Sequence, residues 1–382
     1  MNRSSVWLVV TAPLLIGAGR LFGVEELYAL GVAGGLLPVV CWIGVRTTRL
    51  QLMTNRRIEP ALPTAGDDVR VELAIAATDR SPSCEVEDAL PLGGKIRIDV
   101  GALAAGSGTT ASYRFTTSRR GRIDLGPATG VLSDPFGISS RRSVLGSASS
   151  VLVQPRWTPL TWVRPGEGVG PVDRAIRRLV AGFTPDDLRG VREFRPGDDR
   201  RNVDWKATAR RGLPIVREFE NRSPVTVELV LTPMDLGGFT EEGFERAVGA
   251  VRSFVESLAA DGFGVDARML LPGFDIIDIS ASTLDDARRR LATVAGDGEP
   301  PEPRRSTNEA TLVVRFTGAR SDLVERRGRC VEATLHFDTP TGGLITERPE
   351  NGQRFVVNAG VDLPTAWSAL SRPPGHDHPI ES

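Results

Sequence analysis

The first 46 residues constrain the fold of this chain more than any other part of it. Val6–Gly19 is almost wholly apolar, and Leu27–Val45 is a second apolar run that contains no charged residue. A helix needs ~20 apolar residues to cross ~30 Å of hydrocarbon, a length that the second run meets. The first run meets it only if Arg20 extends its charge to the membrane interface. We therefore predict two transmembrane helices in residues 1–46, with a cleaved signal peptide as the alternative for the first.

The arginines on either side of these runs predict the orientation of the helices. Arg3 precedes the first run and four arginines follow the second within residues 46–57, whereas the connecting stretch 20–26 holds one arginine and two glutamates. Short cytoplasmic segments of membrane proteins are enriched in Lys and Arg. We therefore predict a multi-pass protein of the cell membrane, with both termini and the soluble domains in the cytoplasm.

Net charge and the supply of metal ligands exclude several function classes. The formal net charge is −1, so no basic field favours nucleic acid. Cys41, Cys84 and Cys330 lie far apart, and the three histidines are spread over His336 and the tail. This supply favours neither a disulfide framework, nor a structural zinc site, nor a Ser-His-Asp triad. We expect no cofactor, no small-molecule substrate and no catalytic residue.

Residues 47–158 have the pattern of an antiparallel β-sandwich. Asp68–Ala76 alternates apolar and polar residues, and further short alternating runs follow, separated by Gly-, Pro- and Ser-rich pieces. Two turn signals lie near the end of this region, Gly126-Pro127 and Asp134-Pro135-Phe136-Gly137. For the second we predict a fixed turn with the Phe136 ring packed beneath it.

Residues 225–371 have the pattern of an α/β Rossmann-like domain. Val225–Leu231 predicts a strand, Thr240 is a helix N-cap with two glutamates behind it, and strands and helices then alternate. The segment contains no phosphate-binding glycine motif after a strand, so we expect no nucleotide. Residues 372–382 are predicted to form a disordered tail.

Between these domains, residues 159–224 form a predicted linker with an Arg/Asp-rich loop. From Pro185 to Arg222 it holds ten basic and eight acidic side chains. Asp198 or Asp199 is predicted to cap a short helix that ends at Gly212. Such charge balance favours an ion-pair scaffold with Trp205 as its apolar anchor, and the alternative is a docking surface, for which Arg and Trp are typical. The candidate docking or structural residues are Arg189, Arg192, Gly197, Asp198, Arg201, Asp204, Trp205, Lys206 and Arg210.

This stretch resembles the signature of the bacterial family called domain of unknown function 58. The matching positions are Leu188, Arg189, Arg192, Phe194, Gly197, Asp198, Arg201, Val203, Asp204, Trp205, Lys206, Ala209 and Arg210. The family is also similar in its N-terminal hydrophobic hairpin and in a β-rich segment that ends in the Gly126-Pro127 and Asp134–Gly137 motifs. The resemblance implies a C-terminal von Willebrand factor A-like domain and a partner of the MoxR-type AAA+ ATPase class.

The sequence departs from that resemblance at one position. Many relatives follow the first strand of the last domain with an Asp-x-Ser-x-Ser metal motif, but here Thr232 replaces the aspartate and Asp235 lies three residues later. We therefore predict that this site binds no metal.

Our first hypothesis for the function is a membrane-anchored protein-binding or assembly factor that acts with such an ATPase and is not an enzyme. The alternative is a membrane-bound, hydrolase-like enzyme that uses Asp198, Asp204 and Lys206 as acid–base groups.

Overall fold

The computed structural model forms two compact units, Met1–Gln154 and Pro155–Ser382. The residues that the structure describes are 3–91, 93–181, 188–195, 203–219, 225–300, 310–319, 330–338, 345–347, 352–360 and 362–372.

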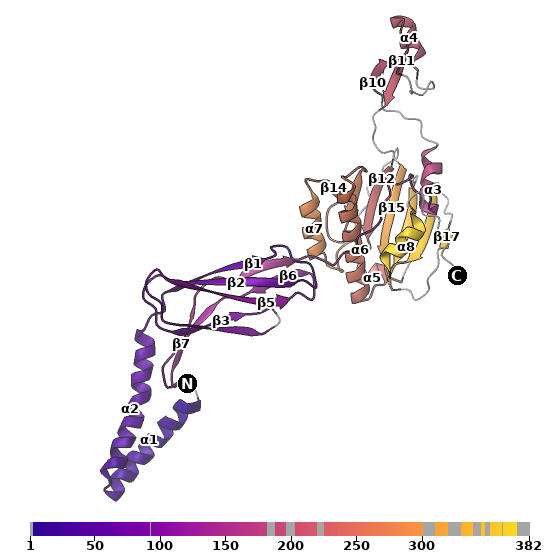
Figure 1. Ribbon diagram of the computed structural model, residues 1–382. Helices are drawn as coiled ribbons and strands as arrows, with labels where there is room; N and C mark the ends of the chain where they lie inside the picture. The colour runs from indigo at the N-terminus through magenta and orange to yellow at the C-terminus, as the bar shows by residue number, and fades with distance from the viewer. Residues whose placement is uncertain are drawn as a thin grey trace. The chain divides into compact units, whose positions relative to one another are not determined.

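The first unit begins with a pair of apolar helices, α1 (Arg3–Phe22) and α2 (Glu25–Thr47) (Figure 1). Helix α2 is long and apolar enough to cross a membrane, whereas in α1 the described side chains begin at Val10, and Val10–Phe22 is a shorter apolar stretch. The two helices approach closely at Gly31, where an added Cβ would lie 2.8 Å from the backbone nitrogen of Ile16. Small residues at such contacts are typical of helix pairs in membranes. The predicted helix pair is therefore confirmed, and the number of membrane crossings and their orientation remain predictions.

In the described residues of the first unit, nine strands follow the helices, and their pairings are antiparallel. They form a three-stranded sheet in the order β1-β2-β5, a four-stranded sheet in the order β4-β3-β7-β8, and a two-stranded sheet of β6 and β9. The strands are β1 (Leu52–Glu59), β2 (Asp68–Ala77), β3 (Cys84–Ala89), β4 (Lys95–Val100), β5 (Gly108–Thr116), β6 (Gly121–Leu125), β7 (Thr129–Ser133), β8 (Ser140–Val144) and β9 (Ser149–Val153).

The alternation predicted for β2 is confirmed by its burial. Val69, Val71, Leu73 and Ile75 are buried, and the residues between them are exposed or half-buried. Leu73 and Ile75 share a core cluster with Val45, which lies in the last turns of α2. The C-terminal end of α2 is therefore packed into the β-rich core.

The Gly126-Pro127 turn lies against a buried ion pair. Arg56 Nη2 lies 2.6 Å from Asp88 Oδ1, and Tyr113 Oη donates to Asp88 Oδ2 at 2.7 Å. Arg56 Nη1 also donates to the Leu125 carbonyl at 3.2 Å. Gly126 leaves room for this guanidinium, because an added Cβ would lie 2.5 Å from Arg56 Nη2.

The Asp134–Gly137 turn differs from its prediction. The Phe136 ring is 66 % exposed, so the expectation that it packs beneath the turn is wrong. The turn is instead fixed by Asp134, whose Oδ1 accepts a hydrogen bond from Phe136 N at 2.8 Å and whose Oδ2 accepts one from Ser139 N. Because the carboxylate occupies the inside of the turn, the ring faces outward.

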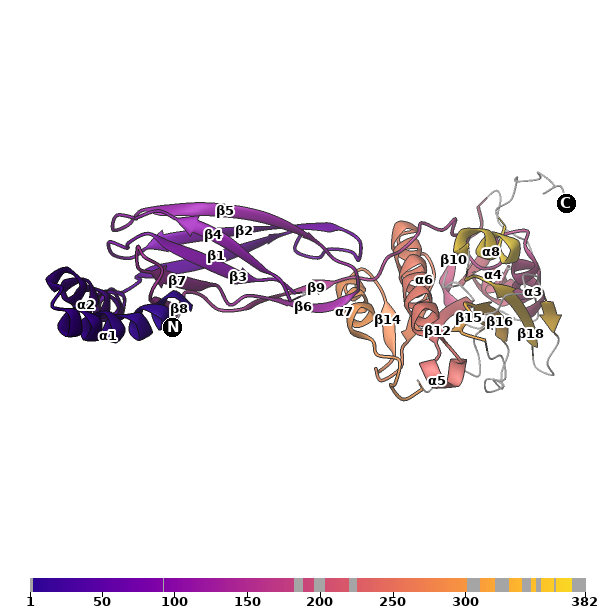
Figure 2. The same ribbon diagram turned by 90° about the horizontal axis from the view of Figure 1, so that it is seen from below.

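The second unit contains a seven-stranded mixed sheet in the order β14-β13-β12-β15-β16-β18-β17 (Figures 1 and 2). The pairs from β13 to β18 are parallel, and the two edge strands, β14 and β17, are antiparallel to their neighbours. The strands are β12 (Val225–Leu231), β13 (Ala267–Leu270), β14 (Ile277–Ile279), β15 (Ala310–Thr317), β16 (Cys330–His336), β17 (Ile345–Glu347) and β18 (Gly352–Asn358). The helices are α3 (Pro171–Val180), α5 (Met234–Gly237), α6 (Glu241–Ala260), α7 (Leu284–Thr293) and α8 (Leu363–Leu370).

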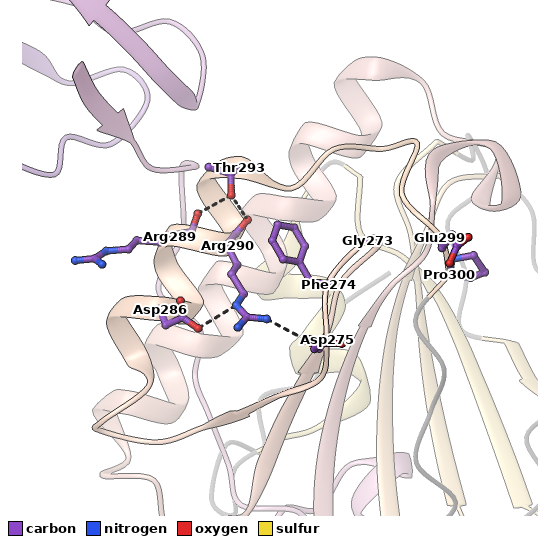
Figure 3. A pocket seen from close by; sticks show the side chains of 9 residues that line it. All are labelled: Gly273, Phe274, Asp275, Asp286, Arg289, Arg290, Thr293, Glu299 and Pro300. Atoms are coloured by element: carbon purple, nitrogen blue, oxygen red, sulfur yellow. Dashed lines mark hydrogen bonds and ion pairs between the residues drawn. The ribbon is translucent and has the colours of Figure 1, made fainter. Parts of the chain in front are cut away.

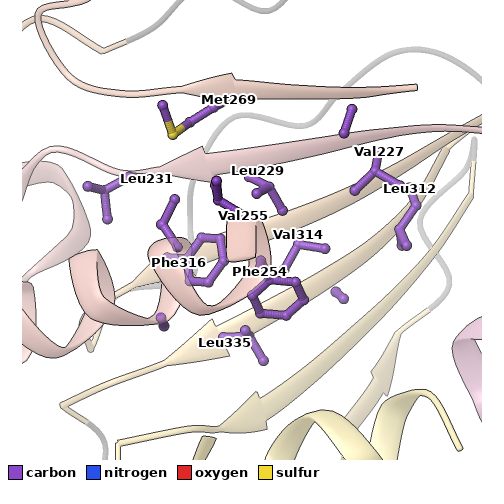
Figure 4. Close-up of a cluster of buried hydrophobic side chains, with 14 of the residues drawn as sticks. Val227, Leu229, Leu231, Phe254, Val255, Met269, Leu312, Val314, Phe316 and Leu335 are labelled. Atoms are coloured by element: carbon purple, nitrogen blue, oxygen red, sulfur yellow. The ribbon is translucent and has the colours of Figure 1, made fainter. Parts of the chain in front are cut away.

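One hydrophobic cluster joins four of these helices to the sheet. It takes Phe254 from α6, Trp367 from α8, Ile176 from α3 and Leu291 from α7, together with alternate residues of the central strands. Figure 4 shows Phe254 of α6 against strand residues such as Leu229 and Val314. Helix α6 begins at Glu241 because Thr240 Oγ1 accepts a hydrogen bond from Gly243 N at 3.0 Å, as its sequence predicts.

A buried carboxylate fixes α3 to the end of α8. Asp173 Oδ1 accepts a hydrogen bond from Gly166 N at 3.1 Å, and its Oδ2 accepts one from Ser371 Oγ at 3.0 Å. Burial raises the pKa of Asp173, although these hydrogen bonds oppose that shift. Because the folded protein holds the proton more tightly than the unfolded chain, this group contributes stability at low pH, and the contribution is lost as pH rises through the folded pKa.

We expect Asp173→Asn to raise the melting temperature of the full-length protein at pH 7, because it removes the cost of keeping a buried charge. Asparagine can still accept from Gly166 N through Oδ1 and can donate to Ser371 Oγ, although its NH2 group cannot accept from Gly168 N, which also donates to the carboxylate. The difference should shrink as pH falls towards ~4, the pKa of an unfolded aspartate. Circular dichroism melts across this range test the prediction. A lower melting temperature for the variant at every pH would contradict it.

Candidate functional site

The candidate motif forms a small hairpin with a helix attached to it. Strand β10 (Leu188–Glu193) pairs antiparallel with β11 (Ile215–Phe219), and α4 (Trp205–Arg211) lies between them in sequence. The helix is joined to β11 at two points. Asp204 N donates to the Ile215 carbonyl at 2.8 Å, and Ile215 N donates to Thr208 Oγ1 at 3.0 Å. Ile215 and Val216 of β11 are buried.

Both ends of α4 are capped by the residues of the motif. Asp204 Oδ1 accepts hydrogen bonds from Lys206 N and Ala207 N, each at 3.0 Å. Gly212 ends the helix with a φ of 72°, a left-handed conformation that glycine adopts without strain. The predicted end at Gly212 is therefore confirmed. The predicted cap was wrong, because Asp204 occupies the N-cap and the helix starts at Trp205.

The exposed face of α4 carries the motif residues Trp205, Lys206, Ala209 and Arg210, whereas Ala207 and Thr208 are half-buried. The Trp205 side chain is 72 % exposed, so the interpretation of this ring as the apolar anchor of an ion-pair scaffold is wrong. Leu213, which the sequence analysis did not single out, is also 54 % exposed. Packing inside the hairpin therefore does not explain an aromatic ring at position 205.

The other predicted residues fall into two groups. Arg189 lies at a register shift of β10, where one extra residue interrupts the pairing with β11, and Arg192 pairs with Val216. Arg192 is half-buried, and its Nη1 donates to the Glu193 carbonyl at 3.1 Å. Gly197, Asp198 and Arg201 lie outside the described residues.

The position predicted to lack a metal lies at the carboxyl end of the central strand β12. Thr232 is buried, and within the described ranges its Oγ1 has no hydrogen-bond partner. Asp235 lies in the first turn of α5. In open α/β sheets, ligands bind at the carboxyl ends of the strands, next to the strand at which the winding direction changes. Strand β12 is such a strand, because the next strand, β13, lies on one side of it and the following parallel strand, β15, lies on the other.

Asp338 lies beside the start of α6 and is already paired. Asp338 Oδ2 accepts from Thr240 N at 2.9 Å, and its Oδ1 accepts from Thr240 Oγ1 at 2.8 Å. Burial lowers the pKa of His336, whose Nδ1 lies 2.8 Å from the Gly318 carbonyl oxygen. Across the described residues, no three His, Cys, Asp or Glu side chains gather as metal ligands. That Thr232 and its surroundings bind no metal stays a prediction.

A shallow pocket of about 880 Å³ lies between α7 and the loop that follows β13 (Figure 3). Arg290 crosses its wall, with Nε 2.9 Å from Asp286 Oδ2 and Nη1 3.2 Å from the Asp275 carbonyl oxygen. The same guanidinium lies over the Phe274 ring, 5.7 Å from its centroid. Arg290 thus holds α7 to the loop through the Asp275 carbonyl and the Phe274 ring.

A family model supports the resemblance of the motif. Residues 190–251, which run from β10 into α6, match the model described as "Protein of unknown function DUF58". The chain is also 27 % identical over 158 residues to the uncharacterized protein YeaD of Bacillus subtilis. The aligned region covers 41 % of this chain and 38 % of YeaD. The match thus spans well under half of that relative. Both findings support a relationship to this family.

Solved structures add little to this result. A CARDB domain from Pyrococcus furiosus is 12 % identical, with a TM-score of 0.21 over 27 % of this chain and 86 % of its own. A PKD domain of an M14-like peptidase from a Thermoplasmatales archaeon is 15 % identical, with a TM-score of 0.20 over 26 % of this chain and 92 % of its own. Likenesses at these scores support no inference about this protein.

Proposed function

We propose that this chain is a membrane-anchored protein-binding factor that docks its partner on the exposed face of α4. The observation that carries the proposal is the position of Trp205, Lys206 and Arg210, which face solvent on a helix that is capped at both ends. Exposed Trp and Arg side chains on a rigid element are the usual composition of interface hot spots. A capped helix also loses little conformational freedom when a partner binds, which favours affinity.

The resemblance to domain of unknown function 58 suggests the class of partner. It implies a MoxR-type AAA+ ATPase, and a cytoplasmic orientation of both soluble units would bring α4 to the same side of the membrane as such an ATPase. On the same ground we propose a von Willebrand factor A-like fold for the α/β region. The support is its central parallel strands, with β12 lying between β13 and β15.

The structure gives the enzyme alternative no additional argument. The Asp204 carboxylate, which that alternative uses as an acid–base group, accepts two amide hydrogen bonds at the start of α4. An N-cap role explains why residue 204 is an aspartate without any catalytic role, since aspartate and asparagine are among the preferred N-caps. We therefore propose a binding function. A hydrolytic activity that is lost in the Asp204→Asn variant would favour the enzyme alternative.

The docking proposal predicts a large loss of affinity for Trp205→Ala. Truncation of a hot-spot tryptophan costs about 2 kcal/mol or more, which is about a 30-fold increase in Kd. We expect this change for binding of the full-length protein in nanodiscs to a purified MoxR-type ATPase from the same organism, measured by interferometry. Since the Trp205 ring is exposed, its removal should leave the circular dichroism spectrum unchanged.

Trp157→Ala is the matched control, because this ring is also exposed but lies outside the motif. The control should bind as the parent does. If the parent binds the ATPase and Trp205→Ala binds equally well, the docking face lies elsewhere. If the parent does not bind the ATPase at all, the proposed class of partner is wrong.

A further inference from the structure

The hairpin of β7 and β8 lies along the last turns of α2 (Figures 1 and 2). Leu132 of β7 shares a core cluster with Val45 of α2, and Arg141 Nη1 donates to the Arg46 carbonyl at 3.1 Å. Beyond these contacts, Asp134 at the tip of the hairpin interacts with the Cys41 thiol. The hairpin therefore follows α2 from Val45 back to Cys41, which is a distance of ~6 Å along the helix axis.

This part of α2 has the features of a membrane interface. The Arg46 guanidinium lies over the Trp42 ring, 5.3 Å from its centroid. Tryptophan and arginine are the side chains that anchor helix ends at the level of the lipid headgroups. Cys41 precedes Thr47, the last residue of α2, by six positions, so it lies ~9 Å inside the helix end. A group beside Cys41 is thus at the boundary between headgroups and hydrocarbon.

The backbone of the hairpin tip is compatible with such a boundary. Its backbone N–H groups are satisfied internally. Asp134 N donates to the Ser139 carbonyl, Gly137 N donates to the Asp134 carbonyl, and the Asp134 carboxylate accepts from Phe136, Ile138 and Ser139. Pro135 has no N–H group to satisfy. An apolar environment penalises unpaired backbone groups, so this satisfaction is a condition for contact with lipid.

The turn has one acidic side chain, Asp134, and one large apolar side chain, Phe136. Burial would raise the pKa of Asp134, but the amide hydrogen bonds outweigh it and hold that pKa below its usual range. These amides hold the carboxylate on the inside of the turn. Phe136 is 66 % exposed on the outside, and the large apolar residues Val39, Val40 and Ile43 are exposed on the neighbouring turns of α2. The helix and the hairpin beside it thus both expose large apolar side chains.

We propose that the Asp134–Gly137 turn is a second membrane contact, in which the Phe136 ring enters the bilayer interface beside α2. This inference rests on the part of the proposed function in which α2 crosses the membrane. The consequence is orientational. The end of α2 is already packed into the β-rich core, so a second contact at the base of that region would add to this packing in fixing its orientation to the membrane.

The test places a fluorescent label at Phe136 in the full-length protein. A Cys41→Ser, Cys84→Ala, Cys330→Ala background leaves one reactive thiol in Phe136→Cys, and serine at position 41 keeps a hydrogen-bond donor for Asp134. The same label is placed at Leu36, which is exposed within α2, and at Leu62, which is exposed in a loop of the β-rich region. Each labelled protein is checked for folding by circular dichroism and reconstituted in phosphatidylcholine–phosphatidylglycerol vesicles.

We expect the Phe136 label to lose emission with lipids that carry a quencher near the headgroup, and to be protected from aqueous iodide. The Leu36 label should be quenched most by lipids with a deep quencher, and the Leu62 label should be quenched by iodide only. If Leu36 is in lipid while Phe136 responds like Leu62, the second contact is overturned and the anchor stands. If Phe136 is protected from both quenchers, a protein covers the ring and the inference also fails. A Leu36 label that is quenched by iodide overturns the anchor itself.

Discussion

Asp88→Ala is expected to destabilise the first unit by about 3–5 kcal/mol, the usual cost of removing one partner from a buried ion pair. Asp88 is fully buried, and it accepts from both Arg56 and Tyr113. Without the carboxylate, the Arg56 guanidinium keeps the Leu125 carbonyl and Ser149 Oγ as neutral acceptors, but its charge is left uncompensated in a dry site. Amide hydrogen exchange of β2 and β3 in the full-length protein measures this loss of stability in the strands around the ion pair.

Glu59→Ala is the matched control for Asp88→Ala. Glu59 pairs with Arg57 at 2.8 Å, one position away from Arg56, but both side chains are largely exposed. Such surface pairs contribute 0 to about 1 kcal/mol, so the exchange of β2 should change little. An Arg56→Leu/Asp88→Leu double variant should recover much of the stability, because it removes both charges together. Equal effects of Asp88→Ala and Glu59→Ala would contradict the assignment of a buried, uncompensated charge.

Trp367→Ala is expected to destabilise the second unit by about 3–5 kcal/mol, which is typical of removing a buried aromatic ring. Trp367 stacks on Trp162 with ring centroids 6.0 Å apart, and it meets Phe254 edge-on at 4.7 Å. Its loss would open a cavity between α8, α6 and the segment that contains Trp162. Hydrogen exchange of β12 and β15 in the full-length protein, followed as urea is added, measures the effect.

Two substitutions control for the chemistry of that change. Trp205→Ala makes the same truncation at an exposed site, so it should cost the second unit little stability. Trp367→Phe keeps most of the ring contacts, and it removes an indole N–H that has no hydrogen-bond partner in the described part of the chain. We expect its cost to be well below that of Trp367→Ala. A loss for Trp367→Phe as large as that for Trp367→Ala would show that packing is not the main contribution.

Local patterns predicted the parts of the fold in which near neighbours in the sequence decide the structure. The apolar runs gave α1 and α2, the alternation in Asp68–Ala76 gave β2, and Thr240 and Gly212 gave helix ends. The cap at Asp204 was missed although it stands directly before the helix. Three aspartates lie between residues 198 and 204, and a pattern does not say which of several equivalent cap residues the backbone uses.

The sequence by itself determined the helix pair, the division into a β-rich and an α/β part, and the motif on which the binding proposal depends. Tertiary structure decided which of its polar and aromatic residues are buried. Asp88 and Trp367 are buried, whereas Trp205 and Phe136 are exposed. The physical reason is that burial depends on partners far away in sequence, such as Arg56 for Asp88 and Trp162 for Trp367. For Phe136 and Trp205 the described chain supplies no such covering, which is why both are proposed to meet something outside it.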